Sequence, residues 1–232
     1  MVEKARAVVL VSGGMDSAVC AAIAARDYQP AALHVSYGQR TEAREARAFS
    51  AICERLRITR RMLLRDDALG KIGGSALTDT SIAVPDAEQE GGRTSGSKVP
   101  VTYVPFRNAH LLAAGVSWAE VLGASRVLIG AVEQDSSGYP DCRPEFYRAY
   151  NEVVRTGTAA GDITIETPLI ALRKAQIVRL GVELGAPLDL TWSCYRREDV
   201  ACGTCESCAL RMQAFRAAGV ADPIPYAQAA SH

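Results

Sequence analysis

The chain has 232 residues with 26 basic and 26 acidic side chains, so its formal net charge is zero. Apolar residues make up 48% of the sequence and charged residues 22%, which is ordinary for a folded domain and excludes a chain disordered by charge. The neutral balance argues against a broad basic surface for gripping nucleic acid, so we expect small-molecule partners and no nucleic acid.

The N-terminal segment carries only a short apolar run, residues 7–11. This run is too short for the core of a signal peptide or for a membrane span, and no later segment is apolar for long enough. We therefore expect no membrane partner and a cytoplasmic location. Cysteines stay reduced in the cytoplasm, where a cysteine cluster more often binds a metal than forms disulfides.

Short apolar runs alternate with helical patterns, which predicts an α/β fold with a parallel sheet covered on both faces. In chain order, the predicted strands are residues 7–11, 31–36, 58–64 and 126–132. The predicted helices are residues 16–26, 41–57, 110–122, 144–155 and 174–184. We expect residues 1–185 to form this domain and residues 186–232 to form a small helical C-terminal region.

One stretch, residues 66–99, breaks the alternation because it is rich in Gly, Ser, Thr and Asp. A long stretch of weak structure inside a compact domain indicates a functional or disordered loop. We expect a mobile, lid-like insertion whose basic and glycine-rich end lies near a ligand. A solvated surface loop is the alternative.

The motif SGGMDS, residues 12–17, directly follows a predicted strand and opens a predicted helix. Backbone N–H groups at such a turn point at an anion, the helix dipole favours its charge, and glycine lets the backbone approach phosphate closely. Ser12 and Ser17 add hydroxyl donors, and Asp16 can organise the turn or a magnesium ion. The motif has no Gly-Lys-Ser/Thr of the Walker type, which excludes a kinase-like loop. A plain strand–turn–helix connection is the alternative.

The C-terminal region contains closely spaced cysteines, namely Cys194, Cys202, Cys205 and Cys208. Four soft ligands in a short segment suit a closed, tetrahedral, structural zinc site, and Gly203 allows a tight turn beneath the metal. An iron–sulfur cluster and free thiols are the alternatives. The remaining cysteines, Cys20, Cys53 and Cys142, are expected to be ordinary thiols.

Polar side chains gather in SGYPDCRPEF, residues 137–146, just after the predicted strand 126–132. Ligands in parallel sheets bind at the carboxyl ends of the strands. Carboxylates at this place can accept the N–H groups of a purine-like ring, and Arg143 can hold a carboxylate group. A proline-rich turn with its charges in water is the alternative.

Two further segments carry cations or amides at predicted helix starts. Arg107 and Asn108 precede the predicted helix 110–122, and Asn108 can serve as its N-cap. Lys174 begins the last predicted helix, where its charge opposes the helix dipole. A phosphate facing Lys174 accounts for a cation at that place, and a solvated lysine is the alternative.

Taken together, the motifs resemble one enzyme family. SGGMDS resembles the pyrophosphate loop of the ATP pyrophosphatase superfamily, which has a Rossmann-like fold of the HUP type and cleaves ATP between the α and β phosphates. The full set resembles the QueC family of queuosine precursor biosynthesis over nearly the whole chain. It comprises VSGGMDS, HVSYGQR, TYVPFRN, SGYPDCRPEF, TPLIALRKAQI, TWSCY and CGTCESCALR.

The resemblance implies a ligase that forms carbon–nitrogen bonds and makes 7-cyano-7-deazaguanine. In that family, ATP adenylates the carboxylate of 7-carboxy-7-deazaguanine and ammonia displaces AMP to give an amide. A second ATP activates the amide oxygen, and loss of AMP leaves the nitrile. The resemblance also implies magnesium with ATP, one structural zinc per chain and a homodimer.

Two other functions remain open at this point. The first is a QueC-like enzyme that attaches the adenylated deazapurine acid to a protein amine. The second is a tRNA-thiolating protein with an iron–sulfur cluster, which the neutral charge disfavours.

The resemblance also implies the roles of individual residues. The residues matching the catalytic positions are Asp16, Ser17 and Lys174, with Lys174 on the pyrophosphate. The residues matching the ATP-binding stretch are Val11, Ser12, Gly13, Gly14, Met15, Asp16, Ser17, Ala18, Val19, Cys20 and Ala21. The expected substrate pocket comprises Tyr37, Arg107, Asp135, Tyr139, Asp141, Arg143 and Glu145. The residues matching the zinc ligands are Cys194, Cys202, Cys205 and Cys208.

The chain departs from the family pattern at three places. Thr41 stands where the family usually has histidine, Arg173 where it commonly has serine or threonine, and Phe106 where it usually has a small residue. These departures leave the expected class of reaction intact and bear on the fine geometry of the substrate pocket.

Overall fold

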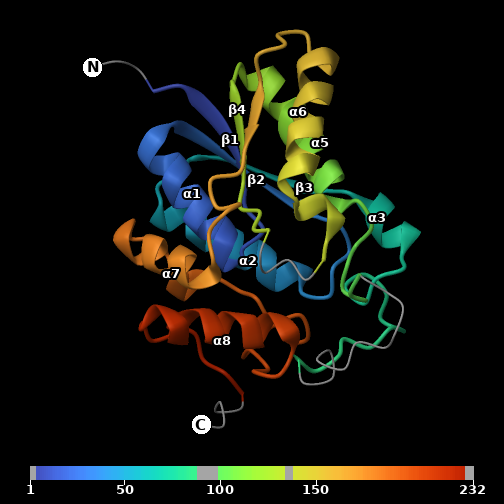
Figure 1. Cartoon of the computed structure of the whole chain (residues 1–232), viewed down its shortest axis with the longest axis vertical. Helices are drawn as coiled ribbons and strands as arrows, with labels where there is room; N and C mark the ends of the chain where they lie inside the picture. The colour runs from blue at the N-terminus through green and yellow to red at the C-terminus, as the bar shows by residue number, and fades with distance from the viewer. Residues whose placement is uncertain (1–3, 88–98, 134–137, 228–232) are drawn as a thin grey trace.

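A five-stranded sheet forms the centre of the fold in the computed structural model, which describes residues 4–87, 99–133 and 138–227 (Figure 1). The paired strands are parallel, in the order β3-β2-β1-β4-β5. Their bounds are β1 (Arg6–Leu10), β2 (Gln29–Ser36), β3 (Arg60–Arg65), β4 (Arg126–Ile129) and β5 (Thr164–Glu166). The predicted α/β, Rossmann-like architecture is confirmed.

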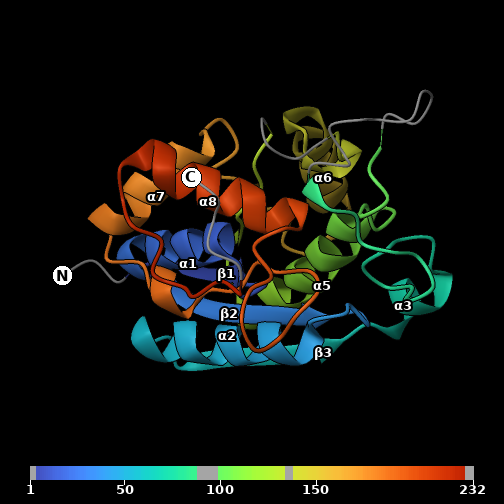
Figure 2. The same ribbon diagram turned by 90° about the horizontal axis from the view of Figure 1, so that it is seen from below.

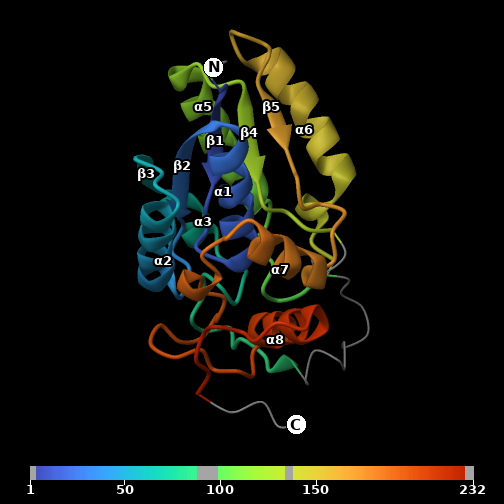
Figure 3. The same ribbon diagram turned by 90° about the vertical axis from the view of Figure 1, so that its left-hand side faces the viewer.

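Helices cover both faces of this sheet, as Figure 3 shows from the side. The α-helices are α1 (Met15–Asp27), α2 (Glu42–Arg55), α3 (Asp67–Ile72), α5 (Arg107–Leu122), α6 (Pro144–Gly157), α7 (Lys174–Glu183) and α8 (Glu206–Ala218). Two short 3₁₀ helices are η1 (Pro140–Cys142) and η2 (Leu188–Leu190). Side chains of α1, α2, α7 and α8 belong to one hydrophobic core, and those of α5 and α6 belong to another.

Strand β1 separates the two cores because successive side chains of a strand point to opposite faces. Ala7 and Val9 belong to the core with α1, whereas Val8 and Leu10 belong to the core with α5. All four side chains are buried, which explains why this strand is a continuous apolar run rather than an alternating pattern.

The strand order places the point of reversal between β1 and β4. The chain passes from β1 outward through β2 and β3, and then returns to β4 on the other side of β1. In parallel α/β sheets, ligands bind outside the carboxyl ends of the strands at such a point. The segment after β1 is the SGGMDS loop, so the topology brings that motif to the expected binding crevice.

Each strand and helix predicted by range is present, with its ends shifted by a few residues. The largest shifts are of three residues: β4 ends at Ile129 rather than at residue 132, and α5 begins at Arg107 rather than at residue 110. Asn108 is therefore in the first turn of α5 and is not its N-cap. The N-cap is Phe106, which adopts a left-handed backbone conformation with φ 57°. The short strand β5 and helix α3 were not predicted.

The predicted insertion, residues 66–99, is described in part, over residues 66–87 and 99, and its mobility and lid-like role stay a prediction. This part contains α3 and the buried side chains of Leu69, Ala76 and Leu77. The guanidinium of Arg40 orders it by donating to the backbone carbonyls of Ala76, Asp79 and Ile82 at 2.6–2.9 Å. The basic, glycine-rich end of the segment lies in residues 88–98, outside the described residues.

The C-terminal region packs against the main sheet domain, with α8 beside α7 (Figure 2), and α7 in turn contacts α1. Phe215 of α8 and Val19 of α1 are completely or almost completely buried in the same hydrophobic core. The boundary at residue 185 stays a prediction. Among the helices that the structure describes, none has both the length and the apolar character needed to cross a membrane.

Candidate functional site

A cavity of about 320 Å³ opens at the carboxyl ends of β1, β2 and β4. Its walls come from segments far apart in the sequence, including the SGGMDS loop, the connections after β2 and β4, and the starts of α5, α7 and α8. Its polar and aromatic lining includes Ser12, Asp16, Ser17, Tyr37, Gln39, Arg40, Thr41, Glu45, Arg107, Asn108, Tyr139, Lys174, Trp192, Tyr195 and Glu206. The size and the mixture of apolar walls with a few polar groups are typical of a small-molecule site.

The SGGMDS loop is held in shape by its own serines. The Ser17 hydroxyl donates to the Gly14 carbonyl at 2.9 Å and accepts from the Ser12 hydroxyl at 3.1 Å. Gly13 has φ 92°, and a Cβ at this position would lie 2.7 Å from the backbone oxygen of Glu45. Only glycine fits there, so the motif requires glycine for close packing as well as for approach to a ligand.

The second close approach is at the end of β4. A Cβ on Gly130 would lie 2.8 Å from the backbone oxygen of Asp16. The absence of a side chain at Gly130 therefore lets α1 begin directly beside β4, which brings the start of α1 to the cavity.

Asp16 and Lys174 form an ion pair at the cavity, with Lys174 Nζ 2.5 Å from Asp16 Oδ2. The pair accounts for a lysine at the N-terminus of α7, where the helix dipole alone disfavours a cation. Asp16 Oδ1 is buried and has no hydrogen-bond partner among the residues that the structure describes. An unsatisfied carboxylate oxygen in a cavity is suited to a cation or to a donor on a ligand.

The expected ATP-binding stretch divides into two parts. Its first part lines the cavity, namely Val11, Ser12, Gly14, Met15, Asp16 and Ser17. Its second part, Ala18, Val19, Cys20 and Ala21, belongs to α1, is completely buried in the core and does not line the cavity. Gly13 is also not among the residues that line the cavity. Burial raises the pKa of the Cys20 thiol well above its ordinary value, so this cysteine stays protonated.

Tyr37 and Arg107 come together on the wall of the cavity. Arg107 Nη1 donates to the Tyr37 hydroxyl at 2.9 Å, and the guanidinium lies 5.7 Å from the centre of the Tyr37 ring. The Tyr139 hydroxyl forms a 2.8 Å hydrogen bond with the hydroxyl of Thr102. Burial raises the pKa of Tyr139 to about 12, so its phenol is neutral at pH 7. This wall thus combines one fixed cation with neutral hydroxyls.

Asp141 is buried behind this wall rather than on it. Its Oδ2 accepts from the backbone N–H of Asn108 at 2.9 Å, and its carbonyl accepts from Asn108 Nδ2 at 2.8 Å. A carboxylate is favourable at a helix N-terminus, so Asp141 fixes the start of α5 and thereby the position of Arg107. Burial raises the pKa of Asp141, while the bond from Asn108 and the charge of Arg107 oppose the rise.

The other expected substrate residues are not found on the cavity wall. Arg143 and Glu145 are exposed at the start of α6, because the chain turns away from the cavity after the 3₁₀ helix η1. Asp135 lies outside the described residues.

Residues that the sequence analysis did not single out also line the cavity, among them Gln39, Glu45 and Trp192. Gln39 follows β2 and Glu45 is in the first turn of α2, so both lie at the carboxyl end of a predicted strand. Their position after a predicted strand was the signal in the sequence that could have indicated a place in the binding site.

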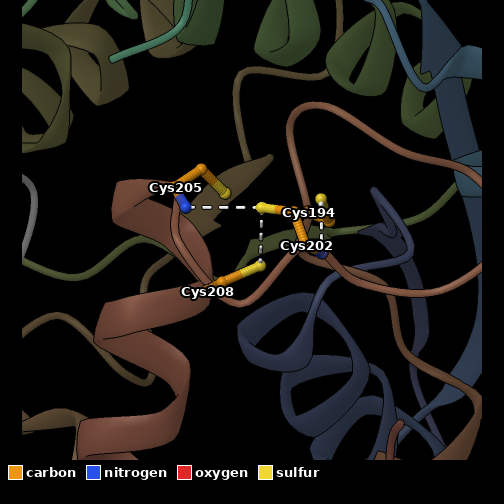
Figure 4. A group of neighbouring side chains, drawn as sticks. All are labelled: Cys194, Cys202, Cys205 and Cys208. Atoms are coloured by element: carbon orange, nitrogen blue, oxygen red, sulfur yellow. Dashed lines mark hydrogen bonds between the residues drawn. The ribbon is translucent and has the colours of Figure 1, made fainter. Parts of the chain in front are cut away.

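The four C-terminal cysteines converge on one point, as Figure 4 shows. Their sulfur atoms all lie within 4.8 Å of one another, and the Sγ atoms of Cys202 and Cys208 are 3.9 Å apart. A tetrahedral site with metal–sulfur distances of about 2.3 Å places its sulfurs about 3.8 Å apart, so the donor set fits zinc. The cluster can hold a metal ion.

Backbone N–H groups surround these sulfurs and favour thiolates. Cys194 Sγ accepts from the backbone nitrogens of Arg196 and Cys202 at 3.4 Å, and Cys202 Sγ accepts from the nitrogen of Cys205 at 3.3 Å. Hydrogen bonds from the thiols of Cys205 and Cys208, together with these N–H groups, lower the pKa of Cys194. By contrast, burial raises the pKa of Cys53, away from the cluster, to about 12.

The segment before residue 88 helps to close the cysteine site. Arg196 donates to the Asp86 carboxylate at 2.6 Å and to the Val84 carbonyl at 2.6 Å, and Asp86 forms a β-bridge with Cys205. Three of the cysteines are buried, and Cys202 is partly exposed. The arrangement is closed, which is typical of a structural metal site.

Comparisons with known proteins identify the family to which this chain belongs. The family model "Queuosine biosynthesis protein QueC" matches residues 6–219. A 7-cyano-7-deazaguanine synthase from Koribacter versatilis is 65% identical over 97% of this chain and 94% of the relative. Those from Acidobacterium capsulatum and Chlorobium luteolum are 64% and 56% identical, over 97% and 95% of this chain and 98% and 96% of their own lengths.

Solved structures with a similar fold are more distant. The NMN synthetase of Francisella tularensis has a TM-score of 0.45 and 19% identity, over 82% of this chain and 65% of that chain. An ammonia-dependent NAD synthetase from Campylobacter jejuni has a TM-score of 0.45 and 16% identity, over 82% of this chain and 68% of that chain. The family match covers the phosphate-loop motif, the cavity wall and the cysteine cluster. The chain therefore belongs to the QueC family, a group of ATP-using synthases that act on small molecules.

Proposed function

We propose that this protein converts 7-carboxy-7-deazaguanine and ammonia to 7-cyano-7-deazaguanine, with release of AMP and pyrophosphate. The observation that carries the proposal is the 65% identity to a synthase of that name over nearly the full length of both chains. Two relatives at 64% and 56% identity carry the same name, which favours the nitrile-forming reaction over attachment to a protein amine and over tRNA thiolation.

The SGGMDS side of the cavity is the nucleotide end. Backbone N–H groups at the start of α1 and the hydroxyls of Ser12 and Ser17 bind phosphate oxygens, and Lys174 neutralises the pyrophosphate as it leaves. The unpartnered Asp16 Oδ1 is suited to a magnesium ion that accompanies ATP. A magnesium ion supplies charge neutralisation for the phosphates when it is bound.

The Tyr37 and Arg107 side of the cavity is the substrate end. Arg107 is always charged and presents a fork of donors that matches a carboxylate. The Tyr37 hydroxyl accepts a hydrogen bond from Arg107, so it orients the guanidinium on the cavity wall. The acid to be adenylated is thereby held between the cation and the phosphate loop, which is catalysis by positioning and charge stabilisation.

The cysteine cluster holds one structural zinc ion. The close approach of the four sulfurs, all within 4.8 Å of one another, and the backbone N–H groups around them support zinc as the metal. A closed site leaves no position for a reacting water, so the metal has a structural role. It stabilises the start of α8 and the neighbouring part of the cavity wall, which includes Tyr195 and Glu206.

Assembly and location complete the proposal. The protein is a homodimer of the cytoplasm that acts on a free base and binds no nucleic acid, in keeping with its net charge of zero. A reducing compartment also keeps the cysteine thiols available for a metal.

The test is to incubate the purified protein with 7-carboxy-7-deazaguanine, ATP, magnesium and ammonium, and to follow the products by mass spectrometry. We expect 7-cyano-7-deazaguanine, AMP and pyrophosphate. Formation of ADP would contradict the phosphate-loop assignment. A product that stops at the amide, or that is linked to a protein, would contradict the nitrile-forming reaction.

A further inference from the structure

A polar cluster of Gln39, Thr41 and Glu45 lines the cavity, and the proposed function leaves it without a role. Gln39 Nε2 donates to Glu45 Oε2 at 3.0 Å, and the Thr41 hydroxyl donates to Glu45 Oε1 at 2.8 Å. An ionised carboxylate offers about four lone-pair positions. Each oxygen of Glu45 therefore retains the capacity to accept a further proton or hydrogen bond from a ligand in the cavity.

The surroundings fix the orientation of this carboxylate. Gln39 Oε1 accepts from the backbone N–H of Tyr37 at 2.8 Å, so the amide of Gln39 is held with its nitrogen toward Glu45. The backbone of Glu45 packs against Gly13 of the phosphate loop. Glu45 is thus anchored between the nucleotide end and the Tyr37 wall of the substrate end.

The pKa of Glu45 is shifted in the direction that favours a general base. Burial raises its pKa, and the repulsion of Glu42 on the same helix acts in the same direction. The hydrogen bonds from Gln39 and Thr41 and the charge of Arg107 oppose the rise. A carboxylate with a raised pKa is a better general base at neutral pH than an ordinary glutamate.

The proposed reaction requires such a base. Ammonia attacks the acyl adenylate, the carbon–oxygen bond to AMP breaks, and the new amide nitrogen must lose a proton. The amide oxygen then attacks a second ATP as pyrophosphate leaves, and the nitrogen loses another proton. When the second carbon–oxygen bond to AMP breaks and the nitrile forms, the nitrogen loses its last proton. Every proton of the original ammonia has to leave inside the cavity.

We infer that Glu45 is the general base that receives these protons, and that Gln39 and Thr41 are the residues that position it. This inference rests on the proposed function. Each proton moves from the nitrogen to a Glu45 oxygen and then to solvent through the cavity mouth, which restores the carboxylate for the following step.

The other carboxylates on the described cavity wall are less suited to this role. Asp16 is paired with Lys174 at the phosphate loop. Glu206 follows Cys205 directly, so its position depends on the metal site. Glu45 is the cavity carboxylate held by neutral donors on both oxygens.

The decisive variant is Glu45→Gln, which keeps the shape of the side chain and removes its ability to take a proton. The Thr41 hydroxyl can accept as well as donate, so it can bond the new amide group and the local fold is retained. The matched control is Glu54→Gln, which removes the same charge from the exposed last turn of the same helix and is not among the groups that shift the pKa of Glu45.

The assay separates the two half-reactions. Exchange of labelled pyrophosphate into ATP, dependent on 7-carboxy-7-deazaguanine, reports adenylation without ammonia. We expect Glu45→Gln to keep this exchange within about threefold of the original protein while ammonia-dependent amide formation falls by about 10²-fold or more. Glu45→Asp should recover part of the amide formation, and Glu54→Gln should match the original protein in both assays.

Several outcomes would overturn the inference while leaving the proposed function intact. One is unchanged amide formation in Glu45→Gln. Another is an equal loss of exchange and amide formation, which would mean that Glu45 supports the site rather than the proton transfer. A third is a selective loss in Glu206→Gln alone. Failure of the original protein to exchange pyrophosphate with this acid would instead contradict the proposed function.

Discussion

The cavity and the cysteine cluster both bring polar groups together, but the two sites differ in how far the hydrogen-bonding and ligand-binding capacity of these groups is used within the protein. At the cysteine cluster, four donors of one kind face one another within 4.8 Å, and backbone N–H groups cover the sulfurs. At the cavity, donors of different kinds face an open space, and Asp16 Oδ1 is buried with no hydrogen-bond partner in the described part of the chain.

This difference separates a structural site from a reactive one. A closed set of ligands can be completed by a single ion and then needs nothing further, so it contributes to folding. An incompletely satisfied set keeps groups available for a transition state, at a cost in stability. Changes at the cavity should therefore reduce activity more than stability, and changes at the cysteines should do the reverse.

The largest expected effect is on Asp16. Replacing it by asparagine keeps the side-chain shape and removes the charge that faces Lys174 and the expected magnesium. We expect the rate of AMP formation to fall by about 10²- to 10³-fold, because the cations that would neutralise the leaving pyrophosphate, Lys174 and magnesium, lose the carboxylate that positions them. Stopped assays of AMP and pyrophosphate, alongside thermal unfolding, measure the two effects.

The matched control for Asp16→Asn is Asp27→Asn at the other end of α1, where Asp27 pairs with Arg26 at the surface. This control should keep full activity. A large fall in the unfolding temperature of Asp16→Asn, with activity retained at low temperature, would contradict the view of Asp16 as a reactive rather than a structural group.

The next effect is at the cysteine cluster. Cys205→Ser removes one sulfur ligand, so we expect loss of bound zinc together with about 4 kcal/mol or more of stability, or roughly 10 °C in Tm for a domain of this size. Metal analysis and thermal unfolding, with and without a chelator, check both. Removal of zinc from the original protein should reproduce the loss.

Cys53→Ser is the control for this variant, because Cys53 is a buried thiol of the core away from the cluster. It should lose some stability and keep its zinc. Iron with visible absorption in the original protein would contradict the zinc assignment. Retention of zinc and stability in Cys205→Ser would contradict a closed four-ligand site.

A smaller effect is expected at the substrate end, where the structure distinguishes two arginines of the same chain. Arg107 lines the cavity, whereas Arg143 is exposed and lies off its wall. Arg107→Lys removes the forked geometry while keeping the charge, and we expect the KM for the acid to rise by about 10- to 100-fold, since a charge-assisted hydrogen bond contributes about 1.5–3 kcal/mol. Arg143→Lys should leave KM unchanged, and the reverse result would move the carboxylate-binding site to the start of α6.

These two arginines also show how far sequence reasoning reaches. Motifs whose residues lie close together in the sequence were predicted from their spacing. The SGGMDS loop follows β1 directly, and the four cysteines converge because they are close in sequence. Hydrophobic runs likewise predicted β1 and β4, whose side chains are buried on both faces.

Features that depend on long-range contacts were not predictable in the same way. Arg107 meets Tyr37 only because β2 ends, and α5 begins, at the same edge of the sheet. Arg143 follows η1, and nothing in its local sequence reports that the chain turns outward there. The three-residue strand β5 owes its existence to pairing with β4, and α3 is too short to have a periodicity of its own.

The smallest expected effect is on the pH dependence of stability, through His34 beside the phosphate loop. His34 Nδ1 hydrogen-bonds to the carbonyl of Val11 at 2.9 Å, directly before the phosphate loop, and burial lowers the pKa of His34 despite that bond. Above the ordinary histidine pKa of about 6.5, neither the folded nor the unfolded chain binds this proton. As the pH falls below that value, the unfolded chain takes up a proton that folded His34 does not, so the free energy of unfolding decreases by up to about 1.4 kcal/mol per pH unit.

His34→Asn keeps a donor for Val11 and removes the titration. Between pH 7 and pH 5, the free energy of unfolding measured with denaturant should therefore fall less in this variant than in the original protein. Equal losses would mean that folded His34 is protonated as readily as the unfolded residue, and that the phosphate-loop end tolerates a buried charge.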